Sequence, residues 1–312
     1  MTAQRDVFIQ ALYEKALVDK DIIFISADMG APTLDQWKFN LTEQFIATGI
    51  SEQNTINVAA GLAKSGKKVF VYMMASWFSR CIEQVRYSCA MANSNVTILG
   101  NGVALGYAPS GPAHQPNEDI ALSRSLLNIE VHSPSNESSA LNLVNLCLES
   151  PKLRYIRFER NYAKQMQSFT YEKDEFIKTL YEHKTNSDKQ IAIFSSGYML
   201  GRALDVASQF DKAKNISVVD LSRIKPLSED ILLEILSKTT QVVTLEEQSL
   251  SGGFGSAICE FICDNGLSCK VLRLGLPDHY LFENGTRDYL IDENGLSVEN
   301  IKNLISKFTE NE

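Results

Sequence analysis

Short apolar runs along the chain alternate with segments whose apolar residues recur at helical spacing. Residues 22–26 and 69–74 are runs with few polar positions, which is typical of buried parallel strands. Residues 6–18 show helical spacing, and residues 54–64 are small and alanine-rich, as in a closely packed helix. Strands joined by helical crossovers explain this alternation, so the pattern predicts an α/β fold with a parallel sheet. In the first half of the chain the same pattern also predicts helix 80–91, strand 96–99, helices 118–127 and 136–148, and strand 153–158.

The second half repeats the alternation after a polar interval. Residues 162–188 are polar and charged, with few β-branched residues, and are predicted to connect two domains. The predicted division is a first domain over residues 1–161, a linker over 162–188 and a smaller α/β domain over 189–312. In the second domain the hydrophobic pattern predicts strands 191–195, 216–219, 241–245 and 269–274 and helices 200–210, 228–237 and 255–263.

Composition narrows the classes of function. The 312 residues are 44% hydrophobic, which is enough to build a core and excludes a disordered chain. The formal net charge is −8 without a dense basic run, which argues against nucleic-acid binding but leaves a small anionic substrate open. No apolar run approaches the ~20 residues of a membrane span, and the first residues contain no apolar signal region. We therefore expect a soluble, cytoplasmic protein.

The cysteines and glycines give weaker signals. The six cysteines form no C-x-x-C pair and the four histidines do not cluster, so we expect buried, reduced thiols and no metal site built by this chain. The glycine-rich segment 251–255 lies between a predicted strand and a predicted helix, and it suits either an anion cradle or close backbone packing. It lacks both the G-x-G-x-x-G spacing and a P-loop lysine, which favours packing.

Three local groups of residues suggest chemistry. In the first, Glu52 begins the small-residue helix that precedes a buried strand. We expect such a carboxylate to be poorly solvated and able to share a proton with a ring nitrogen. An ordinary first-turn glutamate, stabilised by the helix dipole, fits the same residues.

The second and third groups follow predicted strands. Trp77 lies just past a strand end, where open α/β sheets bind ligands, and could either stack on a flat ring or pack in the core. His114 lies in the glycine- and proline-rich loop 101–116. There it could either meet a substrate or bond to the backbone of the loop.

Together and in this order, the three groups resemble the C-terminal half of a transketolase, which joins a pyrimidine-binding domain to a C-terminal domain. The resemblance runs from about residue 5 to the end of the chain and is strongest over 49–161. It includes Gly-Pro-Ala-His-Gln-Pro at 111–116 and Tyr-Ile-Arg at 155–157. Family members that are split into two genes have a C-terminal subunit of about this length.

The resemblance implies thiamine diphosphate chemistry, in which a carbanion of the cofactor carries a two-carbon unit from a ketose to an aldose. Glu52 matches the glutamate that bonds the pyrimidine nitrogen, and Trp77 matches the aromatic residue that stacks on that ring. Asp28 matches a cofactor-site aspartate, and Arg80 matches an arginine of deoxyxylulose-phosphate synthases. His114 matches the histidine that bonds donor hydroxyls and steadies developing charge.

The resemblance also implies two phosphate-binding arginines, Arg5 and Arg160, whose guanidinium groups suit bidentate phosphate contacts. A surface salt bridge is the alternative role for each. Arg157 lies three residues before Arg160, so on an extended strand it faces the other side and is the weaker candidate.

Three positions depart from the transketolase pattern. Ser110 stands where an acidic residue usually bonds a donor hydroxyl, and Gly102 stands where a second histidine helps to bind phosphate. Pro32 replaces the usual serine four residues after Asp28. We therefore expect a substrate other than a standard pentose phosphate, or weaker phosphate binding.

The family's diphosphate and metal motif, Gly-Asp-Gly, does not occur in the 312 residues. The resemblance therefore implies a partner subunit that carries this motif with the Mg²⁺ ligands, in an assembly of two copies of each subunit. Two alternatives stay open: the beta subunit of a thiamine-dependent 2-oxoacid dehydrogenase, and a regulatory subunit of the same fold without catalysis. The sequence Gly-Pro-Ala-His-Gln favours the transketolase branch over the first. Glu52 and His114 argue against the second. A deoxyxylulose-phosphate synthase is less favoured, because that family is normally one long chain.

Overall fold

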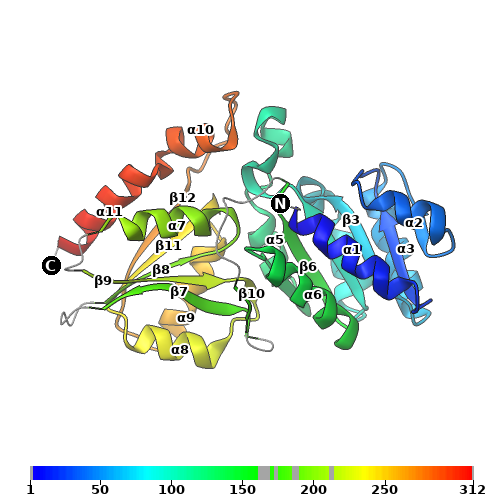
Figure 1. Cartoon of the computed structure of the whole chain (residues 1–312), viewed down its shortest axis with the longest axis horizontal. Coiled ribbons are helices and arrows are strands. Elements are labelled where there is room, and N and C mark those ends of the chain that lie inside the picture. The colour runs from blue at the N-terminus through cyan, green and yellow to red at the C-terminus, as the bar shows by residue number, and fades with distance from the viewer. Residues whose placement is uncertain (1–2, 161–168, 172–174, 185–189, 211–213, 311–312) are drawn as a thin grey trace.

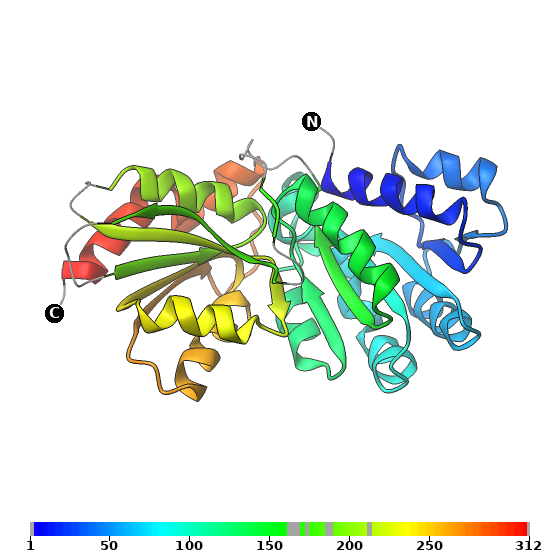
Figure 2. The same cartoon turned by 60° about the horizontal axis from the view of Figure 1, so that its bottom comes forward.

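The computed structural model describes residues 3–160, 169–171, 175–184, 190–210 and 214–310. These residues form two α/β domains that lie side by side, each built around its own sheet (Figure 1). The two-domain α/β architecture predicted from the sequence is therefore confirmed. Helices cover both faces of each sheet (Figure 2).

The first sheet is parallel except at one edge. Its strand order is β10-β5-β6-β4-β3-β1-β2, and the parallel pairs run in continuous register from β2 to β5. The strands are β1 (Ile22–Ser26), β2 (Phe45–Ala47), β3 (Lys68–Met74), β4 (Val96–Asn101), β5 (Ile129–His132), β6 (Leu153–Phe158) and β10 (Arg223–Lys225).

Two apolar clusters sandwich this sheet. One lies under the first helix and includes Phe8, Trp37 and Phe158, while the other faces the helix that begins at Glu52 and includes Ile56. The helices of this domain are α1 (Gln4–Ala16), α2 (Leu34–Asn40), α3 (Glu52–Lys64), α4 (Phe78–Gln84), α5 (Asp119–Ser125) and α6 (Glu137–Glu149). Short helical turns connect them at η1 (Ala75–Trp77), η2 (Val85–Ala90), η3 (Ala104–Ser110) and η4 (Pro112–His114).

The second sheet has the order β12-β11-β8-β9-β7, and among these described strands only the β7–β9 pair is antiparallel. Its strands are β7 (Ile177–His183), β8 (Gln190–Ser195), β9 (Asn215–Leu221), β11 (Gln241–Ser249) and β12 (Lys270–Leu276). Its helices are α7 (Tyr198–Ser208), α8 (Glu229–Ser237), α9 (Phe254–Asp264), α10 (Arg287–Ile291), η5 (Asp292–Leu296) and α11 (Val298–Glu310).

Three edge strands differ from the sequence expectation, and one of them is β2, three residues long, at one edge of the first sheet. Strand β7 lies inside the stretch 162–188 that was predicted to be a linker, and it pairs with β9, so the second sheet begins at Ile177. Strand β10 leaves the second domain and pairs with β5 of the first sheet, which joins the domains (Figure 1). Strand β10 has three residues, and most positions of the seven-residue β7 are at least partly exposed, so the apolar signal of both is weak. Residues 161–168, 172–174 and 185–189 of the predicted linker lie outside the described residues.

The remaining sequence expectations concern thiols and membranes. The six cysteines are free, and burial raises the pKa of the Cys81 thiol to about 12, which keeps it unreactive. Cys263 is exposed and so departs from the predicted burial of the thiols. No helix among the described residues is long and apolar enough to cross a membrane.

Candidate active site

Four of the predicted site residues lie near the carboxyl ends of the strands of the first sheet, a region that we call the carboxyl-end edge. Glu52 is the first residue of α3, Trp77 ends the turn after β3, and Arg160 follows β6 by two residues. His114 lies in the connection from β4 to α5, which we call the His114 loop (residues 101–117). Because these strands are parallel, their carboxyl ends open on the same side, where sheets of this class bind ligands.

Glu52, Arg80 and Trp77 form one contact chain. The Glu52 side chain is 2% exposed, and its Oε2 accepts a hydrogen bond from Nη1 of Arg80 at 3.1 Å. The Arg80 guanidinium carbon lies 4.8 Å from the centre of the Trp77 ring, at cation–π distance. A flat N–H donor thus already lies against both the carboxylate and the indole, so a flat nitrogen heterocycle could take the same place.

The His114 loop faces this group from the other side. The His114 and Trp77 rings meet edge to face at 5.7 Å, and the Tyr107 ring lies 6.3 Å from His114. The guanidinium of Arg160 stacks on Tyr107 at 4.2 Å, while the Tyr107 hydroxyl accepts a hydrogen bond from Asn101 Nδ2 at 3.0 Å. A line of polar groups therefore runs from Glu52 to the exposed Arg160.

The position of Tyr107 explains why residue 102 is glycine. A Cβ atom at Gly102 would lie 1.9 Å from Cε2 of the Tyr107 ring, and the backbone φ of +75° also favours glycine. No larger residue fits while Tyr107 keeps this position. The glycine at 102 and the tyrosine at 107 therefore depend on each other.

Several buried polar atoms at this edge have no partner among the described residues. They include Nδ1 of His114, Oδ1 of Asn101 and both amide atoms of Gln115. Asn101 is fully buried and Gln115 is 2% exposed. Buried polar atoms are rarely left without a hydrogen bond, so their gathering here favours a binding site that a ligand or water completes.

Other predicted site residues lie apart from this line. Asp28 follows β1, is exposed and has a left-handed φ of 56°, and Ser110 is exposed at the end of η3. The Arg5 side chain is already engaged: Nε and Nη2 donate to Asp6 at 3.0 Å each, and Nη1 reaches the Tyr72 hydroxyl at 3.4 Å.

Arg157 has a structural partner. It is 5% exposed and donates to both carboxylate oxygens of Asp119, at 2.8 and 3.2 Å, and to the Ser133 hydroxyl at 3.1 Å. The alternation along β6 thus directs Arg157 inward, whereas Arg160 beyond the strand is exposed.

The glycine-rich segment 251–255 packs closely against its own chain. Cβ atoms at Gly253 and Gly255 would meet Glu246 at 2.4 and 2.7 Å. The Glu246 carboxylate accepts the backbone N–H groups of Phe254 at 2.7 Å and Gly255 at 2.8 Å, which fills the first turn of α9. Burial raises the pKa of Glu246 to about 7 despite these bonds. The anion that this segment binds is a side chain of the protein.

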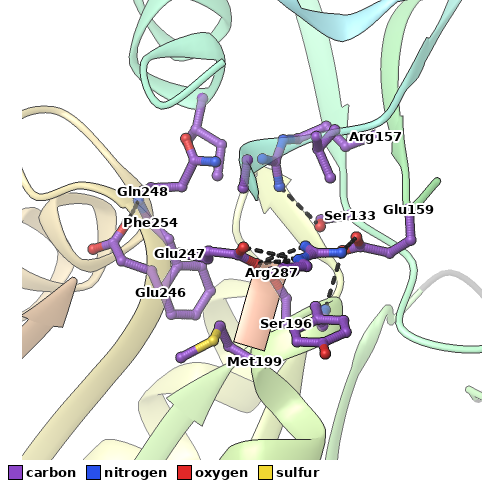
Figure 3. A pocket seen from close by; sticks show the side chains of 14 residues that line it. Ser133, Arg157, Glu159, Ser196, Met199, Glu246, Glu247, Gln248, Phe254 and Arg287 are labelled. Atoms are coloured by element: carbon purple, nitrogen blue, oxygen red, sulfur yellow. Dashed lines mark hydrogen bonds and ion pairs between the residues drawn. The ribbon is translucent and has the colours of Figure 1, made fainter. Parts of the chain in front are cut away.

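A small polar pocket lies where the two domains meet (Figure 3). At its centre Arg287 donates to Glu247, with distances of 2.6 to 3.1 Å, and to Glu159 at 2.5 Å. Removal from water raises the pKa of the Glu247 carboxyl, and the Arg287 charge opposes that rise. Within the described segments, no group of three or more His, Cys, Asp or Glu side chains is placed to hold a metal ion.

Sequence reasoning did not single out Tyr107, Asn101, Glu247 or Arg287. The first two lie in or beside the loop that the glycine and proline pattern marked, and the glycine at position 102 was a usable signal for Tyr107. Glu247 and Arg287 carry no local signal, because their partners are distant in the chain.

Comparison with protein families gives one consistent match. Residues 1–165 match the model described as transketolase, pyrimidine binding domain, and residues 181–301 match transketolase, C-terminal domain. One subunit of the apulose-4-phosphate transketolase of Phocaeicola vulgatus is 30% identical over 304 residues, which are 95% of this chain and 96% of that protein.

Longer relatives match over part of their length. The 1-deoxy-D-xylulose-5-phosphate synthase of Caldanaerobacter subterraneus subsp. tengcongensis is 31% identical over 308 residues, 96% of this chain but 48% of that protein. The chain thus spans about half the length of the synthases it matches.

Solved structures share the fold. A protein described as a split gene transketolase, inactive beta4 tetramer, superposes with a TM-score of 0.86 at 29% identity, covering 98% of both chains. A transketolase from Leishmania mexicana superposes with a TM-score of 0.80 at 18% identity, covering 97% of this chain and 44% of that one.

Proposed function

The chain belongs to the transketolase family, and from this premise we propose that it is the C-terminal subunit of a split, thiamine diphosphate-dependent transketolase. The enzyme would move a two-carbon ketol unit from a ketose, or a ketose phosphate, to an aldose. The observation that carries the proposal is the buried Glu52 carboxylate, 2% exposed, in contact with Arg80 beside Trp77.

The residues at this edge fit the aminopyrimidine ring of the cofactor. Such a ring is flat and carries N–H groups, like the guanidinium that now lies between Glu52 and Trp77. Glu52 would bond the ring nitrogen and hold the proton shared with it, Trp77 would stack on the ring, and Arg80, 47% exposed, can turn outward. When bound, thiamine diphosphate supplies the nucleophilic carbon that carries the two-carbon unit. A cofactor contact of Asp28 stays a prediction.

The His114 loop would orient the sugar. His114 would hydrogen-bond hydroxyls of the donor, and Arg160, stacked on Tyr107, presents its donors to a phosphate or hydroxyl. Ser110 is a weaker partner for a hydroxyl than a carboxylate is. Arg5 would need to share its guanidinium between Asp6 and a phosphate. A substrate that differs from a pentose phosphate near these positions is in keeping with the tyrosine at 107 and the glycine at 102.

We propose that a partner subunit supplies the diphosphate and Mg²⁺ ligands, because Gly-Asp-Gly is absent from these 312 residues. Two copies of each subunit would complete two sites. The names of two relatives, one a transketolase subunit and the other a split gene transketolase, support a partner subunit, whereas two copies of each subunit stays a prediction. A cytoplasmic location remains a prediction.

The test is reconstitution. The chain is mixed with a subunit that carries Gly-Asp-Gly, thiamine diphosphate and Mg²⁺, and two-carbon transfer is measured for a panel of ketoses and aldoses. Glu52→Ala should lower kcat by about 10²–10⁴-fold, because proton transfer by a positioned side chain contributes that much. The matched control is Glu43→Gln, an exposed acid of the same domain, which should leave kcat within twofold.

The outcomes separate the alternatives. Turnover by this chain alone would contradict the split-subunit proposal, and unchanged transfer with Glu52→Ala would contradict the role of Glu52. Release of CO₂ from a 2-oxoacid without ketol transfer would identify the 2-oxoacid dehydrogenase branch. Assembly with the partner, with no turnover for any donor, would identify a regulatory subunit.

A further inference from the structure

The second domain holds the His114 loop at both ends. Near the start of the loop, the backbone N–H of Leu105 donates to Glu247 Oε1 at 3.2 Å. Near its end, the N–H of Ser249 donates to the carbonyl of Asn117 at 3.0 Å, and Gln248 Nε2 reaches the carbonyl of Pro116 at 3.5 Å. Three consecutive residues of β11 thus contact both ends of a loop that belongs to the other domain.

The loop is also part of the core of the second domain. Leu105 and Ala108 are 0% and 1% exposed. They pack in an apolar cluster whose other buried members all lie between Ile191 and Ile305. The Leu105 amide can be buried there without a penalty, because Glu247 accepts its hydrogen bond in place of water.

An ion-pair network fixes Glu247 in turn. Arg287, 8% exposed, donates to both oxygens of Glu247, and its remaining nitrogen donates to Glu159 at 2.5 Å. Glu159 directly precedes Arg160 and accepts the N–H of Tyr198 at 3.1 Å. Figure 3 shows Arg287 between Glu247 and Glu159. The network therefore ties together the two segments that carry Tyr107 and Arg160.

We infer that Glu247 is a positioning residue for the active site. By holding the Leu105 amide, it sets where Tyr107 stands two residues later, and with Gln248 and Ser249 it sets where His114 meets Trp77. The second domain thereby controls the geometry of a site whose chemical groups all come from the first. The inference rests on the proposed function only in that it takes the loop to contact substrate.

The test compares two neighbouring glutamates in the full-length chain. Glu247→Gln weakens the pairing with Arg287 and the hold on the loop, whereas the control Glu246→Gln makes the same change to a buried side chain that bonds the first turn of α9. Amide hydrogen exchange is followed over residues 104–117 and over β3 and β4. Trp77 fluorescence gives a second measure, since the other tryptophan, Trp37, is fully buried in the first domain.

We expect Glu247→Gln to speed exchange in the loop at least tenfold more than in β3 and β4, and to shift the Trp77 emission. Glu246→Gln should change loop exchange by less than threefold. Equal acceleration in the loop and the strands, or equal loop acceleration in the two variants, would overturn the inference. If Glu247→Gln does not fold, Glu247→Asp keeps the charge opposite Arg287 while withdrawing the carboxylate from Leu105, and the same criteria apply to it.

Kinetics of the reconstituted enzyme separate positioning from general stability. Glu247→Gln should lower kcat at least tenfold with the Kd for thiamine diphosphate within threefold, since a displaced loop misplaces His114 but leaves Glu52 in position. A parallel loss of cofactor affinity would contradict the positioning role. Absence of ketol transfer in the wild type would count against the proposed function alone, because the exchange experiment needs no turnover.

Discussion

The carboxyl-end edge of the first sheet and the joint between the domains, where Arg287 contacts Glu159 and Glu247, both contain buried polar groups. The two regions differ in how far the hydrogen-bonding capacity of these groups is satisfied. At the edge, His114 and Gln115 keep buried atoms without partners among the described residues. At the joint, Arg287 bonds two glutamates and Arg157 bonds Asp119. Because an unpaired buried group is costly, the edge is organised to be completed by another molecule, whereas the charged side chains of the joint are paired within the protein.

This difference suits the edge to ligand binding and the joint to fixing the His114 loop. A site that binds and releases ligands needs groups that can change partners, and the half-exposed Arg80 is such a group. A joint that fixes the His114 loop needs the opposite property. Removal of a charged partner should therefore affect folding stability mainly at the joint, and ligand binding mainly at the edge.

The largest expected loss of stability comes from Arg287→Ala. It leaves Glu159 and Glu247 as buried carboxylates without a cation, and breaking a buried ion pair in this way costs about 3–5 kcal/mol. The free energy of unfolding from urea titrations measures it. A loss below about 1 kcal/mol, the range of solvent-exposed ion pairs, would show that water reaches the ion pairs of the joint, as it reaches Arg80 at the edge.

The next largest effect tests the edge through packing. Gly102→Ala should cost about 3 kcal/mol, from the left-handed backbone and from the clash with Tyr107. In a Tyr107→Leu background the clash disappears, so the same substitution should cost about 1 kcal/mol. Denaturant titration of the four proteins in this double-mutant cycle gives the coupling. Equal costs in both backgrounds would contradict the linkage of residues 102 and 107.

A pH-dependent effect tests the joint again. Asp220 is fully buried and accepts hydrogen bonds from the hydroxyls of Ser135, at 2.6 Å, and Tyr171, and burial raises its pKa to about 7. Between about pH 4 and pH 7 the folded protein keeps a proton that the unfolded chain has lost, so the folded state loses stability as pH rises through this window.

Asp220→Asn removes that titration. From about pH 5 to pH 8 the variant should gain roughly 2–3 kcal/mol relative to the wild type, measured as the difference in unfolding free energy at the two pH values. The control is Glu234→Gln, which changes an exposed acid of α8 and should show no such gain. A constant difference between Asp220→Asn and the wild type would mean that Asp220 is ionised throughout.

The smallest expected effect completes the comparison. Arg80→Ala removes a partner of Glu52, as Arg287→Ala does for Glu247, but Arg80 is 47% exposed and water can replace it. The loss should be at most about 1 kcal/mol, since ion pairs open to solvent contribute little. Unfolding titrations beside those of Arg287→Ala measure the contrast. A loss as large as that of Arg287→Ala would remove the distinction between edge and joint.

The strength of the local hydrophobic pattern decided which strands the sequence predicted. Strands β1, β3 and β8 are largely continuous apolar runs, and β6 has apolar residues at four of its six positions, so all four were predicted within one or two residues. The edge strands β7 and β10 were not predicted, because their few buried positions are set by pairing with distant strands. Strand β5, four residues long, was likewise missed.

The residues of the candidate site likewise include some that the sequence marked and some that it did not. Glu52, Trp77 and His114 each follow a strand or begin a helix, so local pattern and resemblance could mark them. The stacking of Arg160 on Tyr107 and the unpaired atoms of Asn101 depend on how β4 and β6 lie side by side. No local pattern contains that information.

The sequence by itself determined two α/β domains, most of the buried strands and a set of chemically suited residues at strand ends, because each follows from short-range hydrophobic periodicity and residue chemistry. Only the tertiary structure decided that Arg80 lies between Glu52 and Trp77, that Tyr107 requires Gly102, and that the second domain holds the His114 loop. The contact of Glu247 with Leu105 joins residues 142 positions apart. Such contacts depend on how complete sheets pack, which the residues near either partner do not encode.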